Sequence, residues 1–540
     1  MLGRRSPQRS LFDVLGLPHQ VHADSFYGRM GAVSDVLFPD DDLAMMYCPD
    51  NGRPSLPPSL MNGVLLLQFY DDVSDEEAVE RTKYDLRWKV ALALALDFPG
   101  FHPTSLTKYR NRLDENGQER YAFNRFLAVG REAGFIPDRV TLLTDTTNVK
   151  GAGAVQDTYT LLRKGLRKLL KAAGFHVPGK RHGLSPRGQG LIERYVEQDT
   201  KADIDWADPQ QRLSHLQVLV EDVETALDLA MEESNNGEVR YLGWLLTKIL
   251  GDDIVTDEEG QSQIGQGTAP DRIISITEPE MRHGRKSKAH RFDGFKAIVS
   301  TEQSSELILD IADVTASGSD GAHLMPTIER VEAESAVTVN RAIADGAFGS
   351  GQNRAACAER DEPIDLVSPL AKPFDSEVHK SAFEIDLETQ SATCPQGHTV
   401  TGKPGPKQDG RPTWRFAFPR ETCEACPLFE RCVRSQKTGR TVRAGPYEEY
   451  LQEARARQET EEFDIAYRLR PAVERKIGEL VMHGLRHTRY VGESKRQLQR
   501  LWLGAAVNLK RLFTLAQAQR VDLRTILGDL GPPKAELATM

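Results

Sequence analysis

The chain has 540 residues and a formal net charge of -10. That length exceeds one small domain, and the acidic total argues against a uniformly basic nucleic-acid binder. No apolar run reaches the roughly 18 to 20 residues of a membrane span, and the N-terminus lacks a signal-peptide core. We therefore expect a cytoplasmic protein of several domains with no membrane partner, whose charged surfaces must be identified segment by segment.

The N-terminal part of the chain predicts helices. Residues 1–56 show no clear period and are expected to form an irregular segment. Residues 57–135 have apolar residues at helical spacing and predict a helical domain. A helix capped by Thr104 or Ser105 would end this domain, as the last helix of a DNA-binding bundle does, although an ordinary bundle with a solvated basic face fits equally well. The cations on that helix are Lys108, Arg110 and Arg112.

Two apolar runs farther along the chain each lead to an aspartate. Val140 to Leu143 predict a buried strand that ends at Asp145, and a second apolar strand is expected to end at Asp345. Between them the pattern predicts a helical insertion, a strand at residues 271–276, a strand hairpin and a helix. This order indicates a mixed α/β fold of the ribonuclease-H-like kind. Ligands of α/β sheets bind at the edge where strands end, so both carboxylates are candidate site residues.

Residues 370–446 are rich in Lys and Arg and contain four of the six cysteines. Cys394 is followed, after 28 intervening residues, by the C-x2-C-x5-C group of Cys423, Cys426 and Cys432. Zinc binds four thiolates tetrahedrally, and close cysteine pairs present two of them from one loop. The spacing favours structural zinc, with an iron-sulfur cluster or reduced, unliganded thiols as the alternatives.

A third acid lies on an expected helix after this region. Tyr467, Arg470 and Glu474 are spaced at i, i+3 and i+7, so one helix would place them on one face. A solvated charged face has the same spacing. Pro471 lies between Arg470 and Glu474 and favours a helix that starts there, with the tyrosine and arginine on the preceding segment. Carboxylates are ligands of Mg²⁺, and two such ions about 4 Å apart can stabilise both oxygens at a reacting phosphorus.

These residues resemble the DDE-type transposases of bacterial insertion sequences, in the group with a Tyr-x2-Arg-x3-Glu signature. LLTDTTNV resembles the strand of the first aspartate, AIADGAFGS the second, and CEACPLFERC the cysteine insertion of one subgroup. The resemblance implies Asp145, Asp345 and Glu474 as catalytic residues that hold two Mg²⁺ ions, with Mn²⁺ as a substitute. It also implies double-stranded DNA as partner, both as terminal inverted repeats and as target, cleavage and strand transfer at those repeats, and a dimer on DNA.

The resulting organisation is a ribonuclease-H-like mixed sheet with helices on both faces. The catalytic domain would comprise residues 136–369 and 447–523, with a helical insertion at about 155–255. Residues 370–446 would form a zinc-ribbon-like insertion, and residues 524–540 a disordered tail. The expected DNA contacts are Tyr467, Arg470, Lys108, Arg110, Arg112 and Lys495.

One position departs from the family signature. A lysine is expected seven positions after the glutamate, and Val481 stands there. Its role would pass to a neighbour, for which the sequence offers Lys476, Arg486 or Lys495. Two other functions stay open: an inactive or domesticated transposase that only binds DNA, and, more weakly, a phosphoaspartyl phosphatase built on Asp145, for which Thr147 replaces the second acid that this chemistry needs.

Overall fold

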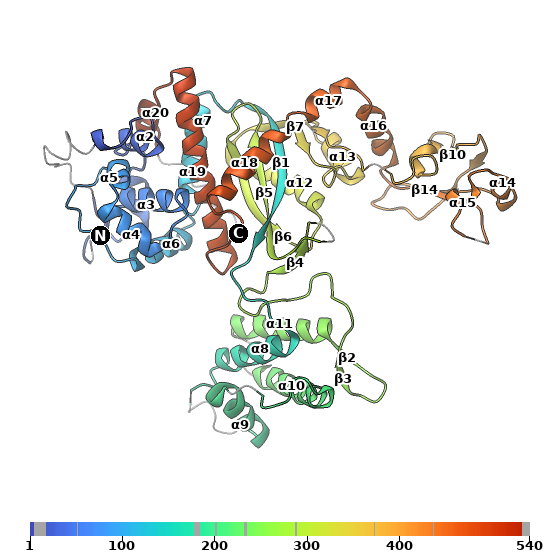
Figure 1. Cartoon of the computed structure of the whole chain (residues 1–540), viewed down its shortest axis with the longest axis horizontal. Coiled ribbons are helices and arrows are strands. Elements are labelled where there is room, and N and C mark those ends of the chain that lie inside the picture. The colour runs from blue at the N-terminus through green and yellow to red at the C-terminus, as the bar shows by residue number, and fades with distance from the viewer. Residues whose placement is uncertain are drawn as a thin grey trace.

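The computed structural model describes residues 1–4, 18–50, 52–177, 184–199, 202–231, 235–286, 289–371, 373–435 and 437–531. Helices at the N-terminus pack beside a central mixed sheet, and a helical insertion and a cysteine-bearing unit extend from this body in different directions (Figure 1). The mixed α/β class expected from the sequence is confirmed. Among the described residues, no helix combines the length and apolar character that crossing a membrane requires.

The central sheet has the order β4-β5-β1-β7-β8, and β6 pairs with the same outer edge of β5 as β4 does. β5 runs antiparallel to β1, whereas β7 and β8 run parallel to it. The predicted hairpin is therefore confirmed as β5 and β6. The strands are β1 (Arg139–Lys150), β4 (Arg282–Arg285), β5 (Arg291–Glu302), β6 (Ile308–Thr315), β7 (Thr338–Ala344) and β8 (Asp365–Val367).

The strand predicted at residues 271–276 is wrong. Ile273 and Ile276 pack into the core of the helical insertion, and Ile274 packs into the core of the body. The backbone makes its hydrogen bonds to Gln156, whose N–H donates to Ile274 O and whose Oε1 accepts from Ile276 N. The apolar run thus reflects burial between two cores rather than a place in a sheet.

The N-terminal helices share one core with the sheet. They pack against α19 (Glu493–Gln519), which stands between them and the strands in Figure 1 and buries Leu498, Leu501 and Trp502. A Cβ on Gly504 would meet the Phe123 ring at 2.8 Å, so glycine lets α19 approach α7 closely. These helices are η1 (Pro18–Gln20), α2 (Phe26–Ala32), η2 (Asp40–Met46), α3 (Pro58–Tyr70), α4 (Asp75–Tyr84), α5 (Leu86–Ala91), α6 (Thr104–Glu115) and α7 (Tyr121–Glu132).

Two helix ends differ from the sequence expectation. Thr104 is the first residue of α6 and Pro103 occupies its N-cap, so neither Thr104 nor Ser105 caps the helix with its side chain. The tail expected to be disordered from residue 524 begins with α20 (Leu523–Asp529), because Leu523 and Leu527 are buried in the main core. Residues 532–540 lie outside the described part of the chain.

The remaining helices of the body surround the sheet. α18 contacts β1 and β5, and α12 contacts β6 and β7. Asn508 of α19 accepts from Ile308 N and donates to Ile308 O, which fastens that helix to β6. These helices are η5 (Asp320–His323), α12 (Leu324–Ser335), α13 (Gly351–Ala358), α16 (Glu448–Gln458), α17 (Glu461–Tyr467) and α18 (Pro471–Met482).

The helical insertion has its own hydrophobic core. Two arginines of its first helix bond within the insertion, because Arg163 and Arg167 both pair with Asp199. Glu278 at its junction with the body accepts from the backbone N–H groups of Ala152 and Gly153. Its elements are α8 (Thr158–Ala172), α9 (Pro186–Ile192), η4 (Glu193–Gln198), α10 (Pro209–Met231), α11 (Gly237–Asp253), β2 (Ile254–Thr256) and β3 (Ser262–Ile264).

The cysteine-bearing unit is built on two small sheets around a third core that contains Phe383, Phe416 and Phe418. Figure 1 shows it extending from the body beyond α16. Its elements are η6 (Lys380–Ala382), β9 (Glu384–Asp386), β10 (Ser391–Thr393), β11 (Thr399–Thr401), β12 (Lys403–Pro404), β13 (Trp414–Ala417), α14 (Arg420–Glu424), α15 (Phe429–Cys432) and β14 (Thr441–Ala444).

Candidate active site

Asp145 lies in the middle of β1 rather than at its end. The strand continues to Lys150 because its ladder with β5 persists to the pair Lys150↔Gly294. Gly294 has φ +149, and a Cβ there would meet Val149 O at 2.3 Å, so glycine permits this close crossing. The prediction that the strand ends at Asp145 is therefore wrong. What ends at this level is the neighbouring strand, β7, whose last residue, Ala344, pairs with Thr144.

Asp345 and Glu474 reach the same place from two other elements. Asp345 directly follows β7, as predicted, so the two aspartates lie on adjacent parallel strands at the same level. Glu474 lies in the first turn of α18, which packs over β1 and β5. All three carboxylates line one cavity of ≈ 570 Å³. The structure thus brings together three acids that are far apart in the sequence.

Arg470 joins two of these acids. Its guanidinium donates to Asp145 Oδ2 at 2.7 Å and also pairs with Glu474. α18 starts at Pro471, so Arg470 occupies its N-cap, and Tyr467 ends the preceding α17, as the proline predicted. The arginine therefore reaches the acids from a turn rather than from the helix that carries Glu474.

The acids are electrostatically coupled. Burial raises the pKa of Asp145 above its ordinary value, and the negative charges of Asp345 and Glu474 raise it further, while Arg470 and the Thr146 N–H oppose them. Burial also raises the pKa of Tyr467, whose ring stacks on Phe463 with centroids 5.8 Å apart. Negative charge is thus concentrated where a cation would be stabilised.

The three carboxylates are a suitable donor set for a divalent cation, although they are too far apart to bind one ion together. Three carboxylates in one cavity are the oxygen ligands that Mg²⁺ prefers. Within the described ranges, no group of three or more His, Cys, Asp or Glu side chains is close enough to hold an ion. The guanidinium of Arg470 supplies the positive charge between Asp145 and Glu474 instead.

A fourth acid of the cavity was missed by sequence reasoning. Asp320, from η5, accepts from Lys296 Nζ at 2.6 Å and from Thr146 Oγ1 at 2.7 Å, and all three residues line the cavity. Asp320 does not end an apolar run, and Lys296 is one of many basic residues along the predicted strands. The sequence carried no signal that these two side chains meet.

Two transposase families match parts of the chain. Residues 17–112 match the family described as Transposase domain (DUF772), and residues 393–513 match the Transposase DDE domain. The chain is a DDE-type transposase of the insertion-sequence kind. No curated protein and no solved structure matches it significantly. The DDE match contains Glu474 and Arg470 but neither Asp145 nor Asp345, so the assignment of the two aspartates depends on the geometry described above.

The transposase places its predicted DNA contacts in different surroundings. Tyr467 and Arg470 lie at the acid site, whereas the others lie elsewhere. Lys108 and Lys495 are exposed, and the Arg112 guanidinium lies over the Tyr47 ring, 4.4 Å from its centroid. Arg110 is buried and donates to both carboxylate oxygens of Asp75, so it fastens α6 to α4 and cannot contact DNA in this conformation.

Only one of the three proposed replacements for the signature lysine lines the cavity. Lys476 is buried and pairs with Glu479 at 2.8 Å. Lys495 lies at the start of α19 and does not line the cavity. Arg486 does line it. Val481 is half-buried against the main core of the transposase.

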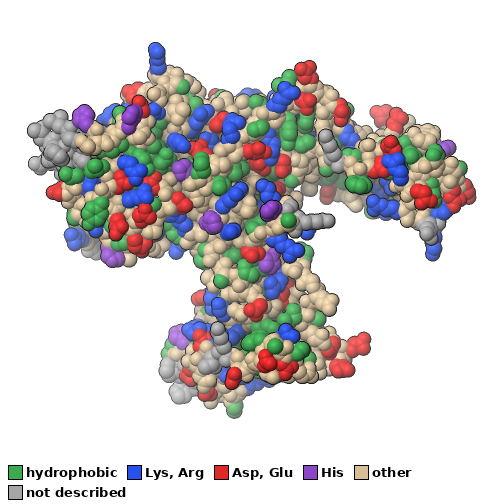
Figure 2. All heavy atoms as spheres, viewed as in Figure 1, with side chains coloured by type: hydrophobic (Ala, Val, Ile, Leu, Met, Phe, Trp, Pro, Cys, Tyr) green, Lys and Arg blue, Asp and Glu red, His purple; other side chains and the backbone are tan. Residues whose placement is uncertain are grey.

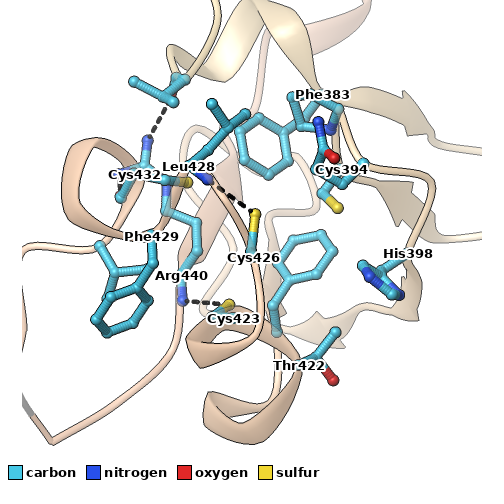
Figure 3. Close-up of a pocket in the computed structure, with 15 residues that line it drawn as sticks. Phe383, Cys394, His398, Thr422, Cys423, Cys426, Leu428, Phe429, Cys432 and Arg440 are labelled. Atoms are coloured by element: carbon cyan, nitrogen blue, oxygen red, sulfur yellow. Dashed lines mark hydrogen bonds between the residues drawn. The ribbon is translucent and has the colours of Figure 1, made fainter.

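The four clustered cysteines of the transposase line a second cavity (Figure 3). Cys394 and His398 come from the β10–β11 turn, Cys423 and Cys426 from α14 and the turn after it, and Cys432 from α15. All four are free thiols. The backbone N–H groups of Arg440 and Leu428 donate to Cys423 Sγ at 3.5 Å and to Cys426 Sγ at 3.4 Å.

Proposed function

We propose that the cavity between β1, β7 and α18 is where the transposase hydrolyses a phosphodiester at a terminal inverted repeat and then joins the freed strand to a target. The observation that carries this proposal is the convergence of Asp145, Asp345 and Glu474, from three separate elements, on one cavity. Nothing adds support to the phosphatase alternative, because Thr147 stands where its second acid is needed and β1 continues through it to Lys150.

The strand arrangement supports a ribonuclease-H-like catalytic domain. Across the sheet these strands lie in the order β6, β5, β1, β7, β8, so the first strand of the chain is central. Only β5 is antiparallel to both of the long strands beside it, β1 and β6. Such a domain would comprise residues 136–369 and 447–523. The helical domain of residues 57–135 would take part in recognising the terminal repeats, on a dimer that brings two transposon ends together.

Asp145, Asp345 and Glu474 would hold Mg²⁺, for which Mn²⁺ could substitute. When bound, the metal pair would activate a water molecule and stabilise the charge that develops on the attacking and leaving oxygens. Arg470, already between two of the acids, is placed to exchange one carboxylate for a phosphate oxygen, to which a guanidinium can donate two parallel hydrogen bonds. Tyr467 would lie beside the same strand of DNA.

Isosteric substitutions test the acid site. Asp145→Asn, Asp345→Asn and Glu474→Gln should each reduce Mg²⁺-dependent cleavage of a duplex with the flanking inverted repeat by at least about 100-fold, by removing charge that acts on the transition state. DNA binding should change little. Glu306→Gln is the matched control, because Glu306 pairs with Arg475 away from the cavity. Wild-type activity in any of the three acid variants would refute this triad. A wild-type protein that binds the repeat without cleaving it would favour the DNA-binding alternative.

We also propose that Cys394, Cys423, Cys426 and Cys432 hold a structural zinc ion in a zinc-ribbon-like unit. The support is the shared cavity and the two N–H groups directed at Cys423 and Cys426. Metal analysis of purified protein should find one zinc per chain, and Cys423→Ser should lower that content. Iron in place of zinc would indicate a cluster, and neither metal would refute the proposal.

A further inference from the structure

The cations that line the acid cavity fall into two groups. Arg470 is engaged by Asp145 and Glu474, and Lys296 by Asp320. Both of these cations are therefore neutralised within the protein. A ligand that displaced either cation from its carboxylate would have to compensate for the free energy of the lost ion pair.

The second group has no such partner. Arg285, Lys286 and Arg486 line the same cavity, and no carboxylate in the described residues lies within 4.0 Å of their charged groups. Three unpaired cations beside a cavity generate a positive potential that favours an external anion. Arginine adds geometric selectivity, because its planar fork matches the paired oxygens of a phosphate.

The two parts of this group flank the cavity from opposite sides. Beyond the end of β7, residues 486–488 take its place beside β1: Lys150 N donates to Arg486 O at 2.8 Å, and Thr488 N donates to Lys150 O at 3.0 Å. Arg285 lies on β4, on the far side of β5. Three inter-strand spacings separate residue 486 from β4, across β1 and β5. The two backbones therefore lie roughly 14 Å apart across the sheet.

The surface around this junction is rich in cations. Figure 2 shows Lys and Arg side chains gathered where the helical insertion joins the body, near the position of β4 in Figure 1. Asp145 lies on β1, between these two sides but five residues before Lys150, and Asp345 follows β7, on the side of residue 486. A strand that contacted both sides would pass beside the acids in the same cavity.

We propose that Arg486 on one side, and Arg285 with Lys286 on the other, bind two DNA phosphates near the scissile one. Arg486 would thereby take the place of the signature lysine that is absent at Val481. This inference depends on the proposed function for the identity of the strand. It adds residues that lie outside the signature helix and, for Arg285 and Lys286, outside both matched regions.

Salt dependence of binding tests the contacts without requiring catalysis. The full-length protein is titrated, without divalent metal, against a duplex carrying the flanking inverted repeat. Arg486→Ala and Lys286→Ala should each make the slope of log K against log salt about one unit shallower. Arg486→Lys should retain the wild-type slope. Arg475→Ala is the matched control: Arg475 is an exposed arginine of α18 that pairs with Glu306 and does not line the cavity.

A single neutral methylphosphonate locates each contact. Scanned through the positions around the cleavage point, it should weaken wild-type binding at two of these positions. At one of them Arg486→Ala should cause no further loss, because the contact is already absent. An unchanged slope in a folded Arg486→Ala, or full additivity at every position, would overturn the proposal. Failure of the wild-type protein to cleave would instead refute the proposed function, since binding is measured independently.

Discussion

Arg110 and Lys108 lie two residues apart on α6, and the fold uses them differently. The Arg110 side chain is 8% exposed, pairs with Asp75 through 2.5 Å and 2.9 Å hydrogen bonds, and lies 4.9 Å from the centroid of the Tyr490 ring. Lys108 is exposed. Both are basic residues on one predicted helix, so the sequence could not separate the residue that holds the domain together from the one available to DNA.

Alanine variants of Arg110 and Lys108 should therefore separate an effect on stability from an effect on DNA binding. Arg110→Ala should lower the free energy of unfolding by roughly 3 kcal/mol, because it leaves Asp75 without its partner in a largely buried site. Lys108→Ala should change it by less than about 0.5 kcal/mol. If Lys108 contacts a phosphate, Lys108→Ala should make the slope of log K against log salt for repeat binding about one unit shallower. Chemical denaturation and DNA titration measure the two effects, and equal stability of both variants would contradict the structural role of Arg110.

The three acids that meet in the cavity were largely predictable at this scale. Asp145, Asp345 and Glu474 were identified by an apolar run, a second apolar run and a helical spacing next to a proline. Asp320, Lys296, Arg285 and Lys286 were not, because their position in the cavity depends on which strands pair. Pairing across β5 joins segments that no local pattern relates to the acids.

At the scale of elements, residues that follow local rules were predicted well and those that depend on partners were not. Pro471 begins α18, since a proline fits the first turn of a helix and disrupts later ones. The hairpin of β5 and β6 followed from two strand patterns joined by a polar turn. In contrast, β1 extends past Asp145 because β5 and residues 486–488 continue its hydrogen bonding. Residues 271–276 form no strand, since within the described part of the chain their backbone bonds to Gln156 and to no strand.

The C-terminal end of α18 predicts a pH-dependent contact with the N-terminal helices. His483 Nδ1 lies 2.5 Å from Tyr70 O, so Nδ1 must carry the hydrogen, and its ring stacks on the Tyr70 ring at 4.6 Å. Burial lowers the pKa of His483, although the Tyr70 carbonyl opposes this. Below the ordinary histidine value of 6.5, the unfolded chain therefore binds more protons than the folded one, and stability falls as the pH drops.

His483→Gln should reduce that dependence while retaining an N–H donor for Tyr70 O. The measurement is the free energy of unfolding at pH 7.5 and at about 5.5, each from urea titration. The decrease between the two values should be smaller in the variant than in the wild type. Because other histidines titrate in both proteins, the difference between the two decreases isolates His483. An identical decrease would show that His483 does not contribute.

At the scale of the whole molecule, the residues that the structure describes are organised around three separate hydrophobic cores. The largest joins the N-terminal helices to the sheet through α19, so these parts should unfold together. The helical insertion and the cysteine-bearing unit each have a core of their own. Composition suggested several domains, but it could not show that the N-terminal helices share a core with the sheet, since that depends on which face of α19 meets which helix.

Removal of the proposed zinc should therefore affect one core and spare the others. The unit around Phe383, Phe416 and Phe418 buries few large side chains, and a core of that size is marginal without a metal or disulfides. Treatment with a zinc chelator, or Cys423→Ser, should increase amide hydrogen exchange across residues 383–444 and leave β1, β5 and β7 protected. Cys48→Ser is the matched control, because Cys48 is an exposed thiol far in sequence from the cluster. An equal rise of exchange in β1 would show that the cysteine-bearing unit and the central sheet unfold as one. Unchanged exchange in residues 383–444 would show that their fold does not depend on metal.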